Sequence, residues 1–115
     1  ANTFEHGVMR MNAARSGDMT AGICDDGHKC CPHWRHGQCA ECSENVFING
    51  AGAFRRGDRG SCGCRHGGEF LGRGGSTTVF VNGKAAMRAG EMTKCEDCGH
   101  FGEIQDGSPN VFIGG

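Results

Sequence analysis

Cysteine and histidine are the residues of this chain best suited to chemistry, and its nine cysteines and six histidines are crowded into a few short segments. Two Cys-x-x-Cys pairs, Cys39 with Cys42 and Cys95 with Cys98, have the spacing with which a tight turn offers two thiolates to one zinc ion. An odd number of cysteines leaves one thiol over from any set of disulfides. In the reducing cytoplasm, cysteines serve more often as metal ligands than as disulfide crosslinks. We therefore predict one or two bound zinc ions, with iron as an alternative metal.

The candidate ligands lie in three loops, two of which carry matching residues. In the second and third loops a cysteine follows four residues after an acid, Cys62 after Asp58 and Cys95 after Glu91. The first loop, residues 24–42, is longer and holds five cysteines and three histidines. With His6 set aside as an ordinary surface histidine, the predicted ligands are Cys24, His28, Cys30, Cys31, His33, His36, Cys39, Cys42, Cys62, Cys64, His66, Cys95, Cys98 and His100.

The first loop also predicts a metal site of its own. Its Cys39 and Cys42 supply two ligands, and a tetrahedral ion needs two more. We expect one further cysteine and one histidine to complete the set, namely Cys30 or Cys31 with His33 or His36. The alternative interpretation for the cysteines as a whole is redox-active thiols or inert buried ones.

Short apolar segments that could position these loops recur three times, at residues 45–50, 78–83 and 110–115. Each places an aromatic residue between two β-branched residues and ends in Asn/Gly or Gly/Gly, which predicts a short strand running into a tight turn. The copies start 33 and 32 residues apart, so the chain is a three-fold repeat of one supersecondary unit. Since a single hairpin is not stable alone, we expect three to share one interior about a pseudo-three-fold axis, with their ligand loops at one end.

A second motif, an arginine, a spacer, a glycine and an acid, recurs in register with the strands. The glycine permits a positive φ angle, and the acid can accept hydrogen bonds from backbone N–H groups that the turn leaves free. Recurrence in all three repeats predicts a structural role for Arg15/Gly17/Asp18, Arg55/Gly57/Asp58 and Arg88/Gly90/Glu91.

Composition limits the size of the core. Leu, Ile, Val and Phe make up about 15% of the 115 residues, too few for an ordinary apolar interior, so metal is expected to contribute a leading share of stability. The length predicts one all-β domain with few or no helices. We expect a lead-in at residues 1–10 and a domain at 11–115 that consists of three repeats, 11–50, 51–83 and 84–115.

Three segments together resemble the PAAR-repeat family: Asn12 to Asp18 (NAARSGD), Asn82 to Glu91 (NGKAAMRAGE) and Gly107 to Ile113 (GSPNVFI). The resemblance covers about residues 9–115. The proline that gives the motif its first letter is replaced in each repeat, and its second alanine in two. The residues that differ are Asn12, Gly52 and Ala85 at the proline, and Phe54 and Met87 at the alanine.

The resemblance implies a small β cone that caps the trimeric spike of a type VI secretion system or a contractile phage tail. It implies a single zinc ion held by His and Cys near the apex, and a broad base that docks as a monomer on the trimeric β-helix of the spike. It further implies assembly in the bacterial cytoplasm, then a place at a virion tail tip or on a secreted spike that pierces the target membrane. The Phe side or the Val/Ile side of the three strands could supply the docking face. Because the last repeat ends at Gly115, we expect a bare tip without a toxin domain.

Other functions fit the sequence less well. A zinc-ribbon or knuckle module that binds other macromolecules would explain the Cys-x-x-Cys pairs, but not the three repeated strands. The formal net charge of −1 and the missing basic stripe argue against a nucleic-acid partner. An enzyme is not expected, since so short a chain lacks a second layer to build a pocket and its acids recur as turn parts. An iron–sulfur electron carrier has enough cysteines, but the histidines favour zinc. No apolar run is long enough for a signal peptide or a membrane span.

Overall fold

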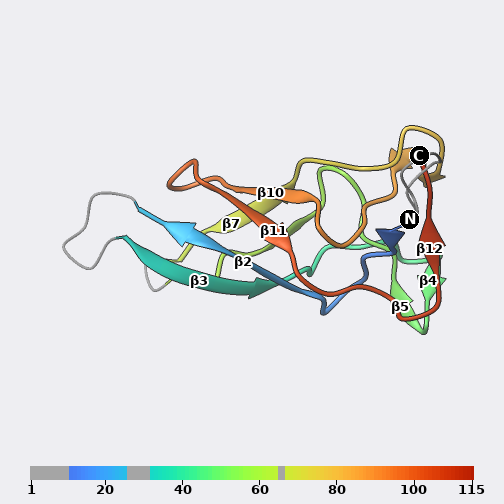
Figure 1. The fold of residues 1–115 in the computed structure, drawn as a ribbon, viewed down its shortest axis with the longest axis horizontal. Helices are drawn as coiled ribbons and strands as arrows, with labels where there is room; N and C mark the ends of the chain where they lie inside the picture. Colours follow the sequence, from blue (N-terminus) through green and yellow to red (C-terminus); the bar gives the residue numbers. More distant parts are fainter. Residues whose placement is uncertain (1–10, 26–31, 65–66) are drawn as a thin grey trace, which may run out of the picture.

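The computed structural model describes residues 11–25, 32–64 and 67–115, and within them the chain forms strands and turns only. Six strands make the main sheet: β2 (Met19–Cys24), β3 (His33–Gln38), β6 (Arg59–Ser61), β7 (Glu69–Gly72), β10 (Met92–Cys95) and β11 (Phe101–Ile104). Three two-residue pairs lie together at one end (Figure 1): β1 (Met11–Asn12) with β12 (Phe112–Ile113), β4 (Phe47–Ile48) with β5 (Ala51–Gly52), and β8 (Phe80–Val81) with β9 (Lys84–Ala85). The all-β prediction is confirmed.

The main sheet is built from one hairpin of each repeat, in the order β3-β2-β11-β10-β7-β6, with every pair antiparallel. Its two edge strands curl toward each other and meet at a bridge between Cys39 and Gly60. Glycine makes that closure possible, because a Cβ on Gly37 would lie 1.6 Å from the carbonyl oxygen of Ser61. Part of the segment predicted as a long first loop is therefore a strand, β3, which pairs with β2; residues 26–31 between the two strands lie outside the described residues.

A closed cycle of backbone hydrogen bonds joins the three repeats. The N–H of Ala14 donates to the carbonyl of Met87, that of Phe54 to Ala14, and that of Met87 to Phe54, each over 3.0 Å. The three side chains are fully buried in the main-sheet core, so the larger residues that replace the motif's alanine fill the interior where the repeats meet. This cycle is the pseudo-three-fold arrangement expected from the repeats.

The Arg-x-Gly-acid turns lie between the main sheet and the small hairpins. In each, the acid accepts a backbone N–H and two guanidinium bonds from its own arginine, for example Arg55 Nε to Asp58 Oδ2 at 2.7 Å. The glycines have φ angles of +89°, +87° and +89°, in the left-handed region that other residues rarely adopt. Asp58 is fully buried, so these turns have the structural role that the motif predicts.

Two apolar clusters fill the described part of the molecule. The one beneath the small hairpins is ordinary, with Ile48, Val81 and Ile113 over three alanines. The one inside the main sheet is not, because five of its ten buried residues are cysteines: Cys24, Cys39, Cys62, Cys64 and Cys95. Thiols thus occupy the place of an apolar core at the end of the molecule away from the small hairpins.

Candidate metal centre and docking face

The described residues bring one cysteine–histidine group close enough to hold a metal ion: Cys24, His33 and Cys64. Their ligand atoms all lie within 4.8 Å of one another. The Sγ atoms of Cys24 and Cys64 are 2.9 Å apart, and His33 Nε2 lies 3.2 Å from Cys64 Sγ. Both cysteines are buried and the histidine is half-buried, which suits a closed site of thiolate and imidazole ligands.

Strand register explains why these residues meet. Cys24 is the last residue of β2 and His33 the first residue of β3, and the two are paired directly across the hairpin. Cys64 arrives from the second repeat through Gly63, whose φ of +70° turns the chain against the backbone of His36. The group therefore lies at the end of the β2–β3 hairpin that points away from the small hairpins (Figure 1).

Cys98, from the third repeat, lies beside this group and offers a third sulfur. Its thiol is hydrogen-bonded to both Cys24 and Cys95. Burial opposes ionisation of Cys98, but backbone N–H groups of His100 and Asp25 stabilise the thiolate, and its pKa is lowered from the ordinary value. Cys24, Cys64 and His33 offer two thiolates and one imidazole from two repeats, and Cys98 from the third repeat would complete a tetrahedral zinc site.

The opposite end of the molecule presents three equivalent phenylalanines to solvent. Phe47, Phe80 and Phe112 are 60%, 58% and 46% exposed. The next residue in each strand, Ile48, Val81 or Ile113, points inward and is buried. Of the two faces that the sequence left open, the phenylalanine face is the exposed one.

Comparison with protein families decides the identity of this three-fold unit. A family model for the PAAR motif matches residues 5–65 and again residues 65–115. The chain belongs to the PAAR family. Members of this family are structural spike tips of contractile injection systems that sit on spike partners, at a tail tip or on a secreted spike. No curated protein matches the chain.

Other predicted cysteine ligands of this PAAR chain lie in two further places. Cys62 and Cys95 form a second thiol pair inside the main sheet, with sulfurs 2.8 Å apart. Cys39 and Cys42 lie beside the Arg-x-Gly-acid turns; burial and the nearby charge of Asp58 raise the pKa of Cys42 to about 12. The structure thus places His33 with Cys24 and Cys64, whereas Cys39 and Cys42 interact with each other and with the turn acids.

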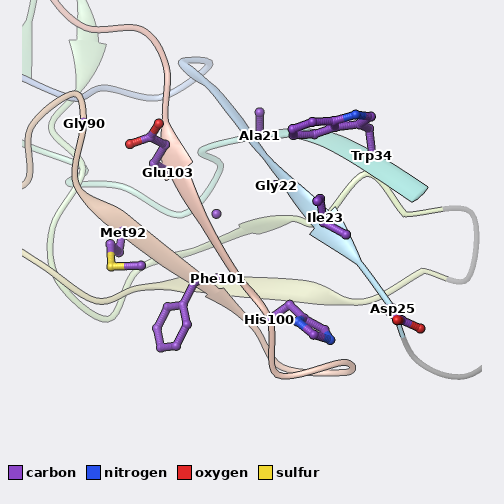
Figure 2. A pocket seen from close by; sticks show the side chains of 11 residues that line it. Ala21, Gly22, Ile23, Asp25, Trp34, Gly90, Met92, His100, Phe101 and Glu103 are labelled. Atoms are coloured by element: carbon purple, nitrogen blue, oxygen red, sulfur yellow. The ribbon is translucent and has the colours of Figure 1, made fainter. Parts of the chain in front are cut away.

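Two of the predicted histidine ligands are on the outside of the PAAR fold. His36 is exposed on β3, and His100 is exposed at the rim of a shallow apolar groove with Ile23, Trp34 and Phe101 (Figure 2). Their roles as ligands remain predictions. His28, Cys30, Cys31, His66 and the lead-in at residues 1–10 lie outside the described residues.

Three serines that organise the base, the end formed by the three small hairpins, were not predicted from the sequence. Ser43, Ser76 and Ser108 are buried, and each accepts a hydrogen bond of 2.9 Å from the backbone N–H three residues later. Their constant offset before each Val-Phe pair was a signal that the repeats could have revealed. No helix in the described residues is long and apolar enough to cross a membrane.

Proposed function

We propose that this chain is the metal-stabilised, membrane-piercing tip of a contractile phage tail or type VI secretion machine, seated as a monomer on a trimeric β-helical spike. The observation that carries the proposal is the set of three exposed phenylalanines, one from each repeat, at one end of the folded molecule. A single chain that presents three equivalent surfaces can engage all three subunits of a trimer in the same way. We expect assembly on the spike in the bacterial cytoplasm, then a place at the tail tip or on the secreted spike.

The base supports docking by its shape and its chemistry. Its three aromatic side chains stand on two-residue strands held by a repeated network of hydrogen bonds, so little ordering is needed on binding. Exposed apolar groups at equivalent positions suit the buried centre of an interface, where aromatic residues contribute most.

The centre at the opposite end supports a mechanical role for the metal. Cys24 and His33 belong to the hairpin of the first repeat, Cys64 to the second repeat and Cys98 to the third. One zinc ion bound by these four residues would tie three hairpins together where force is applied. A structural zinc contributes roughly 10–16 kcal/mol, more than a few apolar contacts could supply.

The direct test is binding to the spike protein encoded for the same machine. Wild-type chain should form a complex of one chain with one spike trimer, measured by analytical ultracentrifugation. Replacing Phe47, Phe80 and Phe112 together by Asp should abolish the complex. The matched control is Trp34→Asp, since Trp34 is exposed on the outer face of β3 and not at the base. Unchanged binding by the triple variant, or equal loss in the control, would contradict the proposed docking face.

A further inference from the structure

A buried arginine inside the main sheet has no hydrogen-bond partner for its charged group. Arg35 of β3 is fully buried, and its Nε, Nη1 and Nη2 atoms make no hydrogen bond within the described residues. A guanidinium stays protonated in proteins, and a buried charge without a compensating charge is strongly destabilising. A negative charge is therefore needed near Arg35.

The buried carboxylates do not supply this negative charge. Among the described residues the buried acids are Asp18 and Asp58, and each is bound by the arginine of its own turn, Arg15 or Arg55. The chain has no tyrosine, and five cysteines are buried in the main-sheet core. Thiols are thus the remaining buried groups of the described chain that can become anions. A cysteine coordinates a metal ion as a thiolate, so metal binding is what makes a buried thiol negative.

Strand register places Arg35 one layer below the candidate metal ligands. Inward-facing residues alternate along β3, so Arg35 follows His33 on the inner face, about 7 Å further along the strand. Across the hairpin Arg35 pairs with Gly22, and the next inward pair is His33 with Cys24. Unit charges at such a separation still interact strongly in a protein interior, where the effective dielectric constant is far below that of water.

The fold makes room for the guanidinium in this layer. Gly22 pairs with Arg35 on one side and with Gly102 on the other, so two neighbouring strands lack side chains beside it. A Cβ on Gly22 would lie 3.2 Å from Arg35 Nη2, and one on Gly102 only 2.7 Å from it. The two glycines therefore hold open the space that the charged group occupies.

We propose that Arg35 is the charge partner of the metal centre, and that its guanidinium offsets the negative charge that thiolates bring to a soft divalent cation such as Zn²⁺. The inference rests on the metal centre of the proposed function and adds a residue outside its ligand set. The thiolates of Cys24 and Cys64 neutralise a divalent cation, and a third thiolate from Cys98 leaves the centre with one net negative charge. Arg35 carries the matching positive charge, so metal binding and the burial of this arginine stabilise each other.

A small anion is the alternative partner. Thr93 Oγ1 is also buried without a hydrogen bond among the described residues, and Thr93 pairs with Gly102, next to Arg35 Nη2. A chloride ion between the guanidinium and this hydroxyl would compensate Arg35 without any metal. Metal affinity would then not depend on Arg35, so the two arrangements give different results.

The experiment measures the Zn²⁺ affinity of the full chain by competition with a chromophoric chelator, in buffers with and without chloride. Arg35→Met, which removes the charge and keeps an unbranched side chain, should weaken Zn²⁺ binding by roughly 10- to 100-fold, the range for outer partners of metal ligands. Arg35→Lys keeps the charge and should weaken binding less. Arg59→Met is the matched control and should leave the affinity unchanged, because Arg59 pairs with exposed acids on the outer surface.

Equal Zn²⁺ affinity in wild type and Arg35→Met would overturn the proposal. Stability that depends on chloride in wild type but not in this variant would then assign Arg35 to the anion. Equal losses in Arg35→Met and Arg35→Lys would also overturn it, since they would indicate a role in packing rather than in charge.

Should Arg35→Met fail to fold, Arg35→Lys decides the question. A loss of affinity below about 10-fold supports the charge role, and a larger loss contradicts it. Wild-type chain that binds no Zn²⁺ would contradict the metal centre itself. Unchanged affinity in Arg35→Met, by contrast, would remove this inference alone and leave the metal centre and the docking face standing.

Discussion

The two ends of the molecule are stabilised in different ways. At the base, each repeat makes the same contacts: a serine accepts a backbone N–H, an arginine pairs with its acid, and an inward-facing Ile or Val packs over alanine. At the far end the repeats diverge, with six-residue strands in the first hairpin and three- or four-residue strands in the others. Half of the buried residues in the core there are cysteines.

The proposed function would account for this difference. A base that docks on a trimer must present the same surface three times, so its hydrogen-bond network repeats. Where the third repeat has Gly114 in place of asparagine, the Gly114 carbonyl accepts the bonds from Ser76 and Arg88 that an Asn side chain accepts elsewhere. A point has no symmetric partner, so its repeats are free to supply different ligands to a shared centre.

Removal of the metal should destabilise the far end of the molecule much more than the base, and this is the largest effect that we expect. Chelation is expected to destabilise the fold by about 10 kcal/mol or more, since each structural zinc contributes that much. Hydrogen exchange should show the largest loss of protection in β2, β3 and β10. If the amides of the base exchanged first while those of the main sheet stayed protected, the assignment of the metal to the far end would be wrong.

Asp58→Asn should be the most damaging substitution in the shared turns. The fully buried carboxylate of Asp58 accepts bonds from Arg55, and Lys84 lies 3.8 Å away, so its loss leaves cations without an anion. We expect a loss of about 3–5 kcal/mol in the free energy of unfolding, measured by denaturant titration of the metal-loaded protein. Glu69→Gln, at an exposed pair with Arg59, is the control and should change stability by less than about 1 kcal/mol. Equal effects would show that the turn acids are not structural.

The glycines of the turns test how equivalent the repeats are. No heavy atom lies within 4 Å of a Cβ placed on Gly17 or Gly57, so Ala there costs only backbone strain, about 1–2 kcal/mol. Gly90→Ala should cost about the same, because that Cβ would only make an ordinary van der Waals contact, 3.4 Å from the side chain of Met11. Thermal unfolding of the three single variants gives the comparison. Widely different losses at Gly17 and Gly57 would mean that the symmetry of the base is only apparent.

Arg59→Ala should have the smallest effect. Arg59 lies on the outside of β6, where it pairs with Glu69 and Glu96 in solvent. Exposed ion pairs contribute about 0–1 kcal/mol, so the midpoint of denaturant unfolding should hardly move. A larger loss would indicate that these charges hold the edge of the sheet.

The repeats made much of the fold predictable. The Val-Phe triplets and the Arg-x-Gly-acid turns are short-range signals, and both occur where the sequence predicts them. The long first hairpin was not predicted, because cysteine, histidine and glycine obscure the alternation of β3. The inward-facing residues of β3 are His33, Arg35 and Gly37, every second residue of the strand. This alternation becomes visible only once one of the three is known to face the core.

The sequence predicted a set of candidate metal ligands, but it could not show which of these cysteines and histidines meet in one site. Cys24 and His33 meet because of strand register, and Cys64 joins them because β3 and β6 close the sheet. Neither relation can be read from spacing, which instead favours the Cys39 and Cys42 turn. No comparable signal in the sequence marks Arg35, which is buried in the main sheet with no hydrogen-bond partner for its guanidinium among the described residues.

X-ray absorption at the metal edge, on protein purified without added metal, asks whether a metal ion holds the far end of the molecule together. A metal-tied tip predicts zinc in every chain, with a first shell dominated by sulfur and containing at least one imidazole nitrogen. Alkylation of the same sample should find Cys24 and Cys64 protected. Protein without metal, with these two cysteines free to alkylate or joined in disulfides, would show that no metal ion holds this end together.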